Sequence, residues 1–223
     1  MAKEGTRFSD FHVSTAVCSA SRAALLTGCY HPRVSVHGAY GPDARQGLHP
    51  DETTIAEMLR AKGYRTACFG KWHLGHRREF LPLQQGFDQW FGLPYSNDMW
   101  PLHPDYVELP PDAAKRKRGY PDLPLYEGNE IVDAEITGEE QATLTRRYTE
   151  CAVQFVADNA DRPFFLYLPH TMVHVPLFAS PEFAGRTGMG LYADVVAEID
   201  WSVGQVLDAL RAHGIDDRTL VVF

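Results

Sequence analysis

Hydrophobic residues recur along this chain either as helical stripes or as short continuous runs. The runs at 64–69, 163–168 and 219–223 predict strands, and the last of them has the composition of a buried strand. Helical spacing predicts two long helices, whose stripes are Leu144, Tyr148, Cys151, Ala152 and Phe155, and Leu191, Val195, Ile199, Val203, Val206 and Leu210 with an end at Gly214. Alternating helices and strands predict an α/β fold, in which a sheet carries helices on its faces.

A further helix is predicted over 51–62, directly before the strand at 64–69. Ile55, Met58 and Leu59 form its predicted apolar face. Thr54 and Glu57 form a predicted capping box, and Gly63 is the predicted end of the helix. Lys71 and His73 follow the strand, at the edge where open α/β sheets bind ligands. If this backbone is extended, both side chains point to the same side.

Cys18 opens a segment that places a thiol, an arginine and a predicted helix start within one short turn. Ser19 and Ser21 are N-cap candidates, and Gly28 is a C-terminal stop. Such a helix aims unpaired N–H groups and the positive end of its dipole beside Cys18, which predicts an anion site. The alternative is that Cys18 is a small buried apolar residue and that Arg22 lies on a solvated face.

Other polar candidates lie in loops. The strand at 163–168 leads into a loop with His170 and His174, and histidine transfers protons near neutral pH because its ordinary pKa is about 6.5. A structural histidine in a turn is the alternative. Ser96 lies in a loop that contains glycine and proline, and either lines a pocket or is simply exposed. The range 101–138 is rich in proline and charge, which predicts a long loop or insertion.

Composition narrows the classes of function. A chain of 223 residues that is 44% hydrophobic can form one sizeable core or most of one. The net charge is −8, and the longest basic run, at 115–118, lies among prolines and a glycine, which argues against a general nucleic-acid role. No apolar stretch approaches the ~20 residues that span a bilayer, and no signal-peptide pattern is seen at the start. Cysteines at 18, 29, 68 and 151 lack the paired spacing of a zinc site.

Two motifs resemble the two signatures of the type I sulfatases: CSASRAALLTG, which begins at Cys18, and GYRTACFGKWHLG, which contains Lys71 and His73. In that family a formylglycine-generating enzyme oxidises the signature cysteine to formylglycine, whose hydrated aldehyde is the nucleophile. The resemblance implies that Lys71 and Arg22 hold the charge of the sulfate. It also implies that His73 contacts the formylglycine hydroxyl and is the base that expels sulfate.

Two weaker motifs extend the resemblance. His174 fits the H-x-P motif whose histidine protonates the departing alcohol, whereas His170 does not fit it. FLPLQQGF followed by GLPYSND resembles the arylsulfatase A branch, which implies that Ser96 lines the substrate pocket. The resemblance covers nearly the whole chain and implies the alkaline-phosphatase-like version of the α/β fold, a sandwich with a central, mostly parallel sheet.

The ends depart from the family pattern. Sulfatases begin with a strand that delivers an Asp-Asp pair to a divalent cation, usually calcium, and continue after a TLVVF-like strand into S-D-N-G with two more ligands. Neither segment is present in residues 1–223, so we expect a partial catalytic domain that is incomplete at both ends. Calcium takes six to eight oxygen ligands, and apart from modified Cys18 no matched ligand remains. Asp10, Asp43 and Asp98 are expected to be ordinary surface or loop acids.

The sequence therefore predicts a sulfuric ester hydrolase, arylsulfatase-like, that cleaves a small-molecule or carbohydrate sulfate ester. It would work through formylglycine at Cys18, with calcium in the complete enzyme, and this chain alone would be inactive or weakly active. Family resemblance implies a periplasmic, secreted or lysosome-like location. The alternatives are a non-catalytic fragment that binds an anion or a partner, and a phosphonate or phosphate monoester hydrolase of the same superfamily.

Overall fold

The computed structural model describes residues 1–110 and 119–223, so the basic run predicted at 115–118 lies outside the described residues. Helices α1 to α6 are Cys18–Thr27, Ile55–Arg60, Pro104–Val107, Gly138–Gln141, Leu144–Asp158 and Leu191–Ala212. Strands β1 to β5 are Arg65–Phe69, Gln89–Gly92, Leu125–Glu127, Glu130–Asp133 and Phe164–Tyr167. Among the described residues, short 3-10 helices occupy His31–Val34, Arg78–Phe80, Pro82–Gln85 and Asp216–Arg218.

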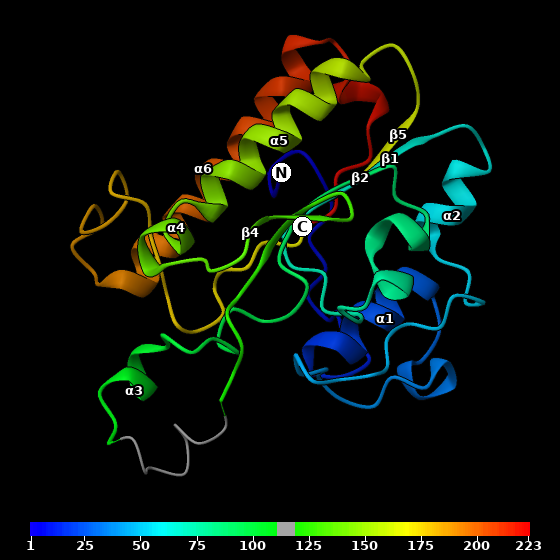
Figure 1. Cartoon of the computed structure of the whole chain (residues 1–223). Helices are drawn as coiled ribbons and strands as arrows, with labels where there is room; N and C mark the ends of the chain where they lie inside the picture. The colour runs from blue at the N-terminus through cyan, green and yellow to red at the C-terminus, as the bar shows by residue number, and fades with distance from the viewer. Residues whose placement is uncertain (111–118) are drawn as a thin grey trace.

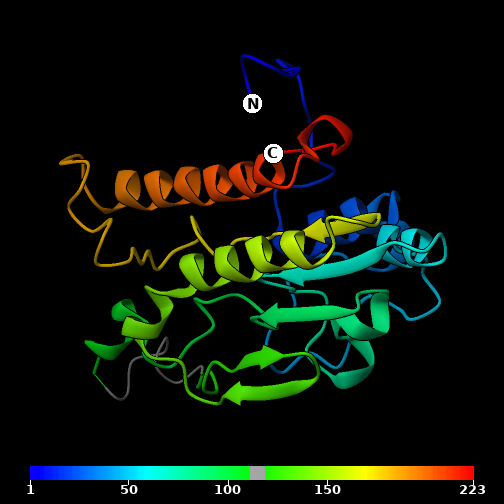
Figure 2. The same ribbon diagram turned by 90° about the horizontal axis from the view of Figure 1, so that it is seen from above.

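The strands form one sheet in the order β4-β3-β2-β1-β5. Strand β1 is parallel to both β2 and β5, whereas the β3–β4 hairpin is antiparallel to its neighbours. Helices α5 and α6 run side by side, and Figures 1 and 2 show the five strands arranged as one layer next to them. Helices α1 and α2 lie on the opposite side of the sheet in Figure 1. The expected α/β fold with helices on both faces of the sheet is confirmed.

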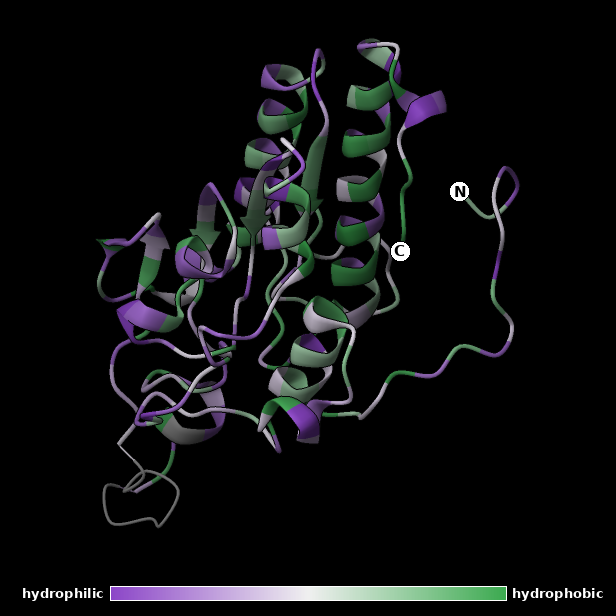
Figure 3. Cartoon of the chain, turned by 90° about the vertical axis from the view of Figure 1, so that its right-hand side faces the viewer, coloured by the Kyte–Doolittle hydropathy of each residue, from purple (hydrophilic) through white to green (hydrophobic). Residues whose placement is uncertain are grey.

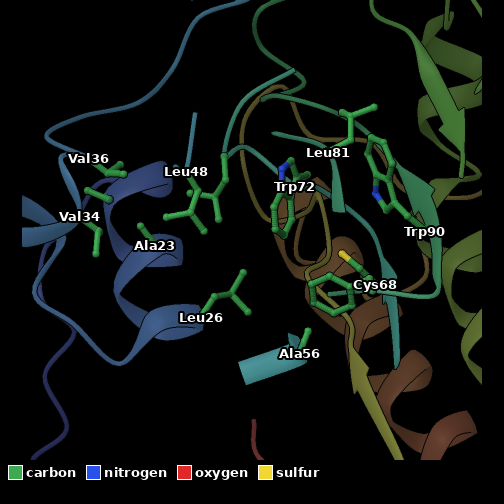
Figure 4. Close-up of a cluster of buried hydrophobic side chains, with 13 residues drawn as sticks. Ala23, Leu26, Val34, Val36, Leu48, Ala56, Cys68, Trp72, Leu81 and Trp90 are labelled. Carbon is green, nitrogen blue, oxygen red and sulfur yellow. The ribbon is translucent and has the colours of Figure 1, made fainter. Parts of the chain in front are cut away.

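Alternating residues of β1 build a core on each face of the sheet, because successive side chains of a strand point to opposite faces. Cys68 packs with Ala23 and Leu26 of α1, in the cluster that Figure 4 shows around Trp72. On the other face, Ala67 and Phe69 pack with the buried stripe of α5, namely Leu144, Tyr148, Ala152 and Phe155. The stripe predicted for α5 is therefore confirmed, and these two cores fix the edge of the sheet to which β1 delivers Lys71 and His73.

Helix α1 begins at Cys18, which is earlier than a helix capped by Ser19 or Ser21 would begin. Its N-cap is Val17, which makes no side-chain cap, and Gly28 ends it with a φ of 68°. Ser19 is fully buried inside the first turn, where its hydroxyl accepts a hydrogen bond from the backbone N–H of Tyr40. The serine N-caps were wrong because this tertiary contact takes the hydroxyl that would have capped the helix.

Helix α2 is shorter than predicted and buries a different face. The capping box of Thr54 and Glu57 is confirmed. Ile55 and Met58 are exposed, however, and Ala56 is the residue that α2 buries in the core. The predicted apolar face was wrong because α2 packs through Ala56 and Glu57 instead: a Cβ on Gly86 would be 2.4 Å from the Glu57 backbone nitrogen and 2.8 Å from the Ala56 carbonyl carbon.

Two regions differ from the sequence prediction in their strands. The range 101–138, predicted to be a long loop or insertion, contains α3 and the β3–β4 hairpin, which extends the sheet. The strand predicted at 219–223 is absent, since Leu220 and Phe223 are about nine-tenths exposed and this segment pairs with no described strand. An apolar run forms a strand only where a neighbour pairs with its backbone.

The predicted end of α6 is correct, because Gly214 adopts a left-handed conformation just beyond it. Figure 3 shows α6 coloured largely as hydrophobic and the N-terminal segment extending away from the helices. The helix also buries Asp194 and Glu198, which accept hydrogen bonds from the backbone of 180–187. These bonds secure the segment that follows the His174 loop. No helix of the described residues is long and apolar enough to cross a membrane.

Candidate active site

The segment after β1 is held from both sides by neighbouring strand ends. The backbone N–H of Gly70 donates to Phe91, that of Lys71 to Pro169, and that of His73 to Pro94. Gly70 has a φ of 133°, and a Cβ there would lie 2.1 Å from the Pro169 carbonyl oxygen, so only glycine allows this close approach. The carboxyl ends of β1, β2 and β5 therefore meet in one place, as expected for a ligand site in a parallel sheet.

Lys71 is buried, with 2% of its surface exposed, and its Nζ donates a hydrogen bond of 2.8 Å to Ser96 Oγ. Burial lowers the pKa of Lys71 to about 8, and the nearby charge of Arg22 adds to the effect. The ammonium form still predominates at pH 7. A buried cation that a neutral hydroxyl positions can attract an oxyanion more strongly than a solvated lysine would.

His73 is held in one tautomer. Its backbone has a φ of 61°, so it is not extended as predicted, but its side chain still reaches Cys18. Its Nε2 lies 2.8 Å from the Tyr40 carbonyl oxygen, and because a carbonyl only accepts, Nε2 carries the proton. Nδ1 is then unprotonated and can accept a hydrogen bond. This atom is buried and has no hydrogen-bond partner among the described residues. Burial lowers the pKa of His73, which favours this neutral form.

His174 also contacts Cys18 and is more accessible than His73, with about a third of its side chain exposed. Its Nδ1 lies 2.7 Å from the Val175 carbonyl oxygen and therefore carries a proton. The hydrogen-bonding contact with Cys18 raises the pKa of His174, and the Val175 carbonyl and the charge of Asp98 contribute in the same direction. The protonated ring is favoured here, in contrast to His73.

Asp98 was wrongly expected to be an ordinary loop acid. Its Oδ1 lies 3.9 Å from His174 Nδ1 and is buried without a hydrogen-bond partner among the described residues. Its charge also acts to raise the pKa of Lys71. The signal was already in the sequence, since Asp98 is the last residue of the loop motif that contains Ser96.

Cys18 stands at the first position of α1 and contacts both histidines. Its contact with His174, then that with His73, lowers the pKa of the thiol to about 5, and the charge of Lys71 contributes as well. The start of the helix adds backbone N–H groups that have no partner within the helix. The structure thus brings together Cys18, Lys71, His73, Ser96 and His174, whose roles the sequence could only propose.

Arg22 and His170 line the same cavity of about 370 Å³ as Cys18, Lys71 and His174, but they contact different groups. The Arg22 guanidinium donates to the Lys71 carbonyl oxygen and, at 3.4 Å, to the Tyr167 hydroxyl. It therefore supports the Lys71 backbone. Burial lowers the pKa of His170 to about 4, and its Nε2 lies 3.3 Å from Ser202 Oγ. His170 is a half-buried neutral residue of the wall.

The unmodified thiol provides a direct test of this geometry. We expect iodoacetamide to alkylate Cys18 with a midpoint near pH 5, because the thiolate predominates above the folded-state pKa of about 5. His174→Ala should move the midpoint upward, since it removes the largest cause of the shift. Cys151, whose pKa burial raises, is the internal control. The measurement is peptide mass spectrometry after timed labelling; an unshifted Cys18 midpoint near pH 8 to 9 would contradict the contact.

The pocket does not by itself form a calcium site. Among the described residues no group of three His, Cys, Asp or Glu side chains is placed to share a metal ion. Asp98 has a buried carboxylate oxygen beside His174 that accepts no hydrogen bond from the described residues. Lys71 and Arg22 add positive charge that repels a cation. Calcium, which takes six to eight oxygens, would therefore need ligands from elsewhere.

The mixed sheet, with its parallel strands β2, β1 and β5 and the pocket at their carboxyl ends, defines an α/β domain of the alkaline-phosphatase-like class, as the sequence predicted. The family model described as Sulfatase matches residues 1–223, and the chain belongs to the sulfatase family. It is 40% identical over 237 residues to arylsulfatase G of Mus musculus, covering 100% of this chain and 44% of the relative. It is 39% identical over 234 residues to arylsulfatase A of Homo sapiens, covering 100% of this chain and 45% of the relative.

A solved structure agrees with this assignment. The PsFucS1 sulfatase from Pseudoalteromonas sp. superposes with a TM-score of 0.78 at 25% identity, covering 91% of this chain and 44% of that chain. The chain thus spans less than half the length of the relatives that it matches. Family membership and fold are established by these matches.

Proposed function

We propose that this chain is the nucleophile-bearing part of a sulfatase that hydrolyses a sulfate monoester. The observation that carries the proposal is the meeting of Cys18, Lys71 and His174, which come from three separate sequence motifs, around one cavity, with His73 in contact with Cys18. One buried cation and two histidines, of which His73 has a lowered and His174 a raised pKa, suit the cleavage of an anionic ester.

Position 18 fits the modification that family resemblance implies, because the side chain is half-buried at a helix start and contacts both histidines. Formylglycine formed there by a formylglycine-generating enzyme would supply, when hydrated, the hydroxyl that attacks sulfur. Lys71 Nζ, oriented by Ser96 Oγ, binds a sulfate oxygen and offsets the charge that develops on it. Arg22 holds the backbone of Lys71 in place for this task.

The two histidines divide the proton transfers. His174 is held protonated at Nδ1 by the Val175 carbonyl, and its Nε2 proton can pass to the departing alcohol. His73 keeps its Nε2 proton on the Tyr40 carbonyl, so Nδ1 can accept a proton from the remaining hydroxyl at position 18. Loss of that proton would break the carbon–oxygen bond to sulfate, so that sulfate leaves and the aldehyde returns. The released products are the alcohol and sulfate. No step is assigned to calcium, since the described residues do not hold it.

We expect the modifying enzyme to convert Cys18 when it is expressed together with this chain. Mass spectrometry of the peptide should then show a loss of about eighteen daltons, since the thiol gives way to an aldehyde. Cys29, which lies just beyond α1, should keep its mass and serves as the internal control. A thiol retained at Cys18 under these conditions would contradict the proposed nucleophile.

The activity itself is tested on p-nitrophenyl sulfate with the 223-residue chain and with a protein extended to the length of its relatives. The extended protein should turn over the ester, Cys18→Ala should abolish turnover, and Cys29→Ala should retain it. The short chain should be weak, as expected for a partial catalytic domain without the metal ligands. Turnover of phenyl phosphonate but not of the sulfate would favour the phosphonate hydrolase alternative. Binding without turnover of either ester would favour a non-catalytic domain.

The substrate class and the location are proposed on family grounds. An aryl or carbohydrate sulfate ester is the proposed substrate, and a periplasmic, secreted or lysosome-like compartment is the proposed location. Cell fractionation with an antibody against residues 1–17, which are mostly exposed, would test the location.

A further inference from the structure

The loop at 96–98 sends three consecutive side chains to three different parts of the site. Ser96 Oγ accepts a hydrogen bond from Lys71 Nζ at 2.8 Å. Asp98 Oδ1 lies 3.9 Å from His174 Nδ1. Asn97 lies between these two residues and is fully buried. Through Ser96 and Asp98 the loop therefore contacts Lys71, proposed to bind sulfate, and His174, proposed to protonate the alcohol. Neither of these contacts explains why Asn97 is buried between them.

Asn97 connects this loop to the segment that carries His174. Its Nδ2 donates to the Pro176 carbonyl oxygen at 3.1 Å and to Gln141 Oε1 at 3.2 Å. The carbonyl can only accept, so the amide must turn its NH₂ group toward Pro176. Pro176 has no N–H of its own to help anchor the segment, and Gln141 is equally buried at the end of α4. Asn97 thus links the 96–98 loop to the segment two residues beyond His174.

We propose that Asn97 is a positioning residue, which holds His174 in register with Lys71 by tying the 174–176 segment to the 96–98 loop. This inference rests on the proposed function of His174 as the proton donor to the alcohol. Proton transfer requires the donor to lie within hydrogen-bond reach of the leaving oxygen. A misplacement of about 1 Å can cost on the order of a hundredfold in rate. Asn97 itself is not one of the residues that line the cavity, and its side-chain hydrogen bonds go to Gln141 and Pro176.

The test compares Asn97→Asp with two matched variants in the extended protein. Aspartate has nearly the same shape but presents oxygen to the Pro176 carbonyl, so that contact is lost, while the Gln141 amide can turn and donate to it. Gln141→Leu removes the other contact and leaves the bond to Pro176. Asn159→Asp removes a comparable buried bond, since Asn159 Nδ2 donates to the Phe155 carbonyl at 2.8 Å far from the site.

We expect Asn97→Asp to lower kcat for an alkyl or sugar sulfate by on the order of ten- to a hundredfold. On p-nitrophenyl sulfate its effect should be small, because that alcohol departs without a proton, and KM should change little. Gln141→Leu and Asn159→Asp should show no such dependence on the leaving group. Equal losses of Asn97→Asp on both esters, or the same selectivity in Asn159→Asp, would overturn the proposal.

A second readout separates this inference from the proposed function. Amide hydrogen exchange of the 171–178 segment in the 223-residue chain should accelerate in Asn97→Asp and remain unchanged in Asn159→Asp. The histidine ring resonances of His174 should shift in the first variant alone. If the wild-type protein hydrolyses no sulfate ester, the proposed function is wrong. If hydrogen exchange of 171–178 and the His174 ring resonances are unchanged in Asn97→Asp, the positioning role of Asn97 is wrong as well. Asn97→Ser, which keeps a small donor, replaces Asn97→Asp if the latter does not fold.

Discussion

Replacing Lys71 with alanine should lower turnover of every sulfate ester by on the order of a hundredfold or more, the range seen when one charge-stabilising donor is removed. Lys71 is nearly fully buried, and its Nζ is aimed by Ser96, so its charge acts on the substrate with little screening by water. The loss should be alike for activated and unactivated esters, because the lysine supports charge on the sulfate oxygens throughout the reaction.

The measurement is kcat/KM on p-nitrophenyl sulfate and on a sugar sulfate in the extended protein. Lys62→Ala, which removes an exposed lysine just beyond α2, is the matched control and should remain within twofold of wild type. Lys71→Ala leaves Ser96 without its donor, so thermal unfolding should be recorded in parallel. A folded Lys71→Ala variant with nearly normal turnover of both esters would remove Lys71 from the site.

The sequence predicted the parts of the fold that local patterns determine. The stripe of α5 and the capping box of α2 follow from spacing alone, and both are present. The prediction of a strand at 219–223 was wrong because a strand also needs a neighbouring strand to pair with, and the pattern within the run does not show whether one is present. The prediction of Ser19 as an N-cap was wrong for a similar reason: its hydroxyl accepts a hydrogen bond from the backbone of Tyr40, a contact that forms only on folding.

The site shows the same division. Motifs identified Cys18, Lys71 and His174, which the structure places around one cavity. What motifs did not supply is which ring nitrogen of each histidine carries the proton. That assignment depends on which carbonyl each ring binds: Tyr40 for His73 and Val175 for His174. Backbone carbonyls carry no sequence signal, since every residue has one.

Asn97 and Asp98 mark a further limit of sequence reasoning. They directly follow the proposed pocket serine, Ser96, yet an asparagine and an aspartate in a loop are ordinarily turn residues. Only the approach of the 174–176 segment, which is distant in the sequence, gives each of them a partner in the site. Loops that converge from separate strand ends therefore require a structure before their polar residues can be interpreted.

His174→Ala should discriminate between leaving groups far more than Lys71→Ala does. Turnover of an alkyl or sugar sulfate should fall by about a hundredfold or more, within the range that general acid catalysis contributes. Hydrolysis of p-nitrophenyl sulfate should change only severalfold, because p-nitrophenolate leaves without a proton. The largest cause of the raised pKa of His174 is its contact with the Cys18 thiol, which formylglycine replaces. The Val175 carbonyl and the charge of Asp98 also raise this pKa and remain in the modified enzyme, where they favour the protonated ring.

The rival histidine provides the decisive comparison. His170 lines the same cavity four positions earlier, but burial lowers its pKa to about 4, so it has no proton to give at neutral pH. His170→Gln should therefore leave the ratio of the two substrates' kcat/KM values unchanged, even if the variant is less stable. If His170→Gln alters that ratio and His174→Ala lowers both activities equally, the proton donor is His170, and the H-x-P motif has been assigned to the wrong role.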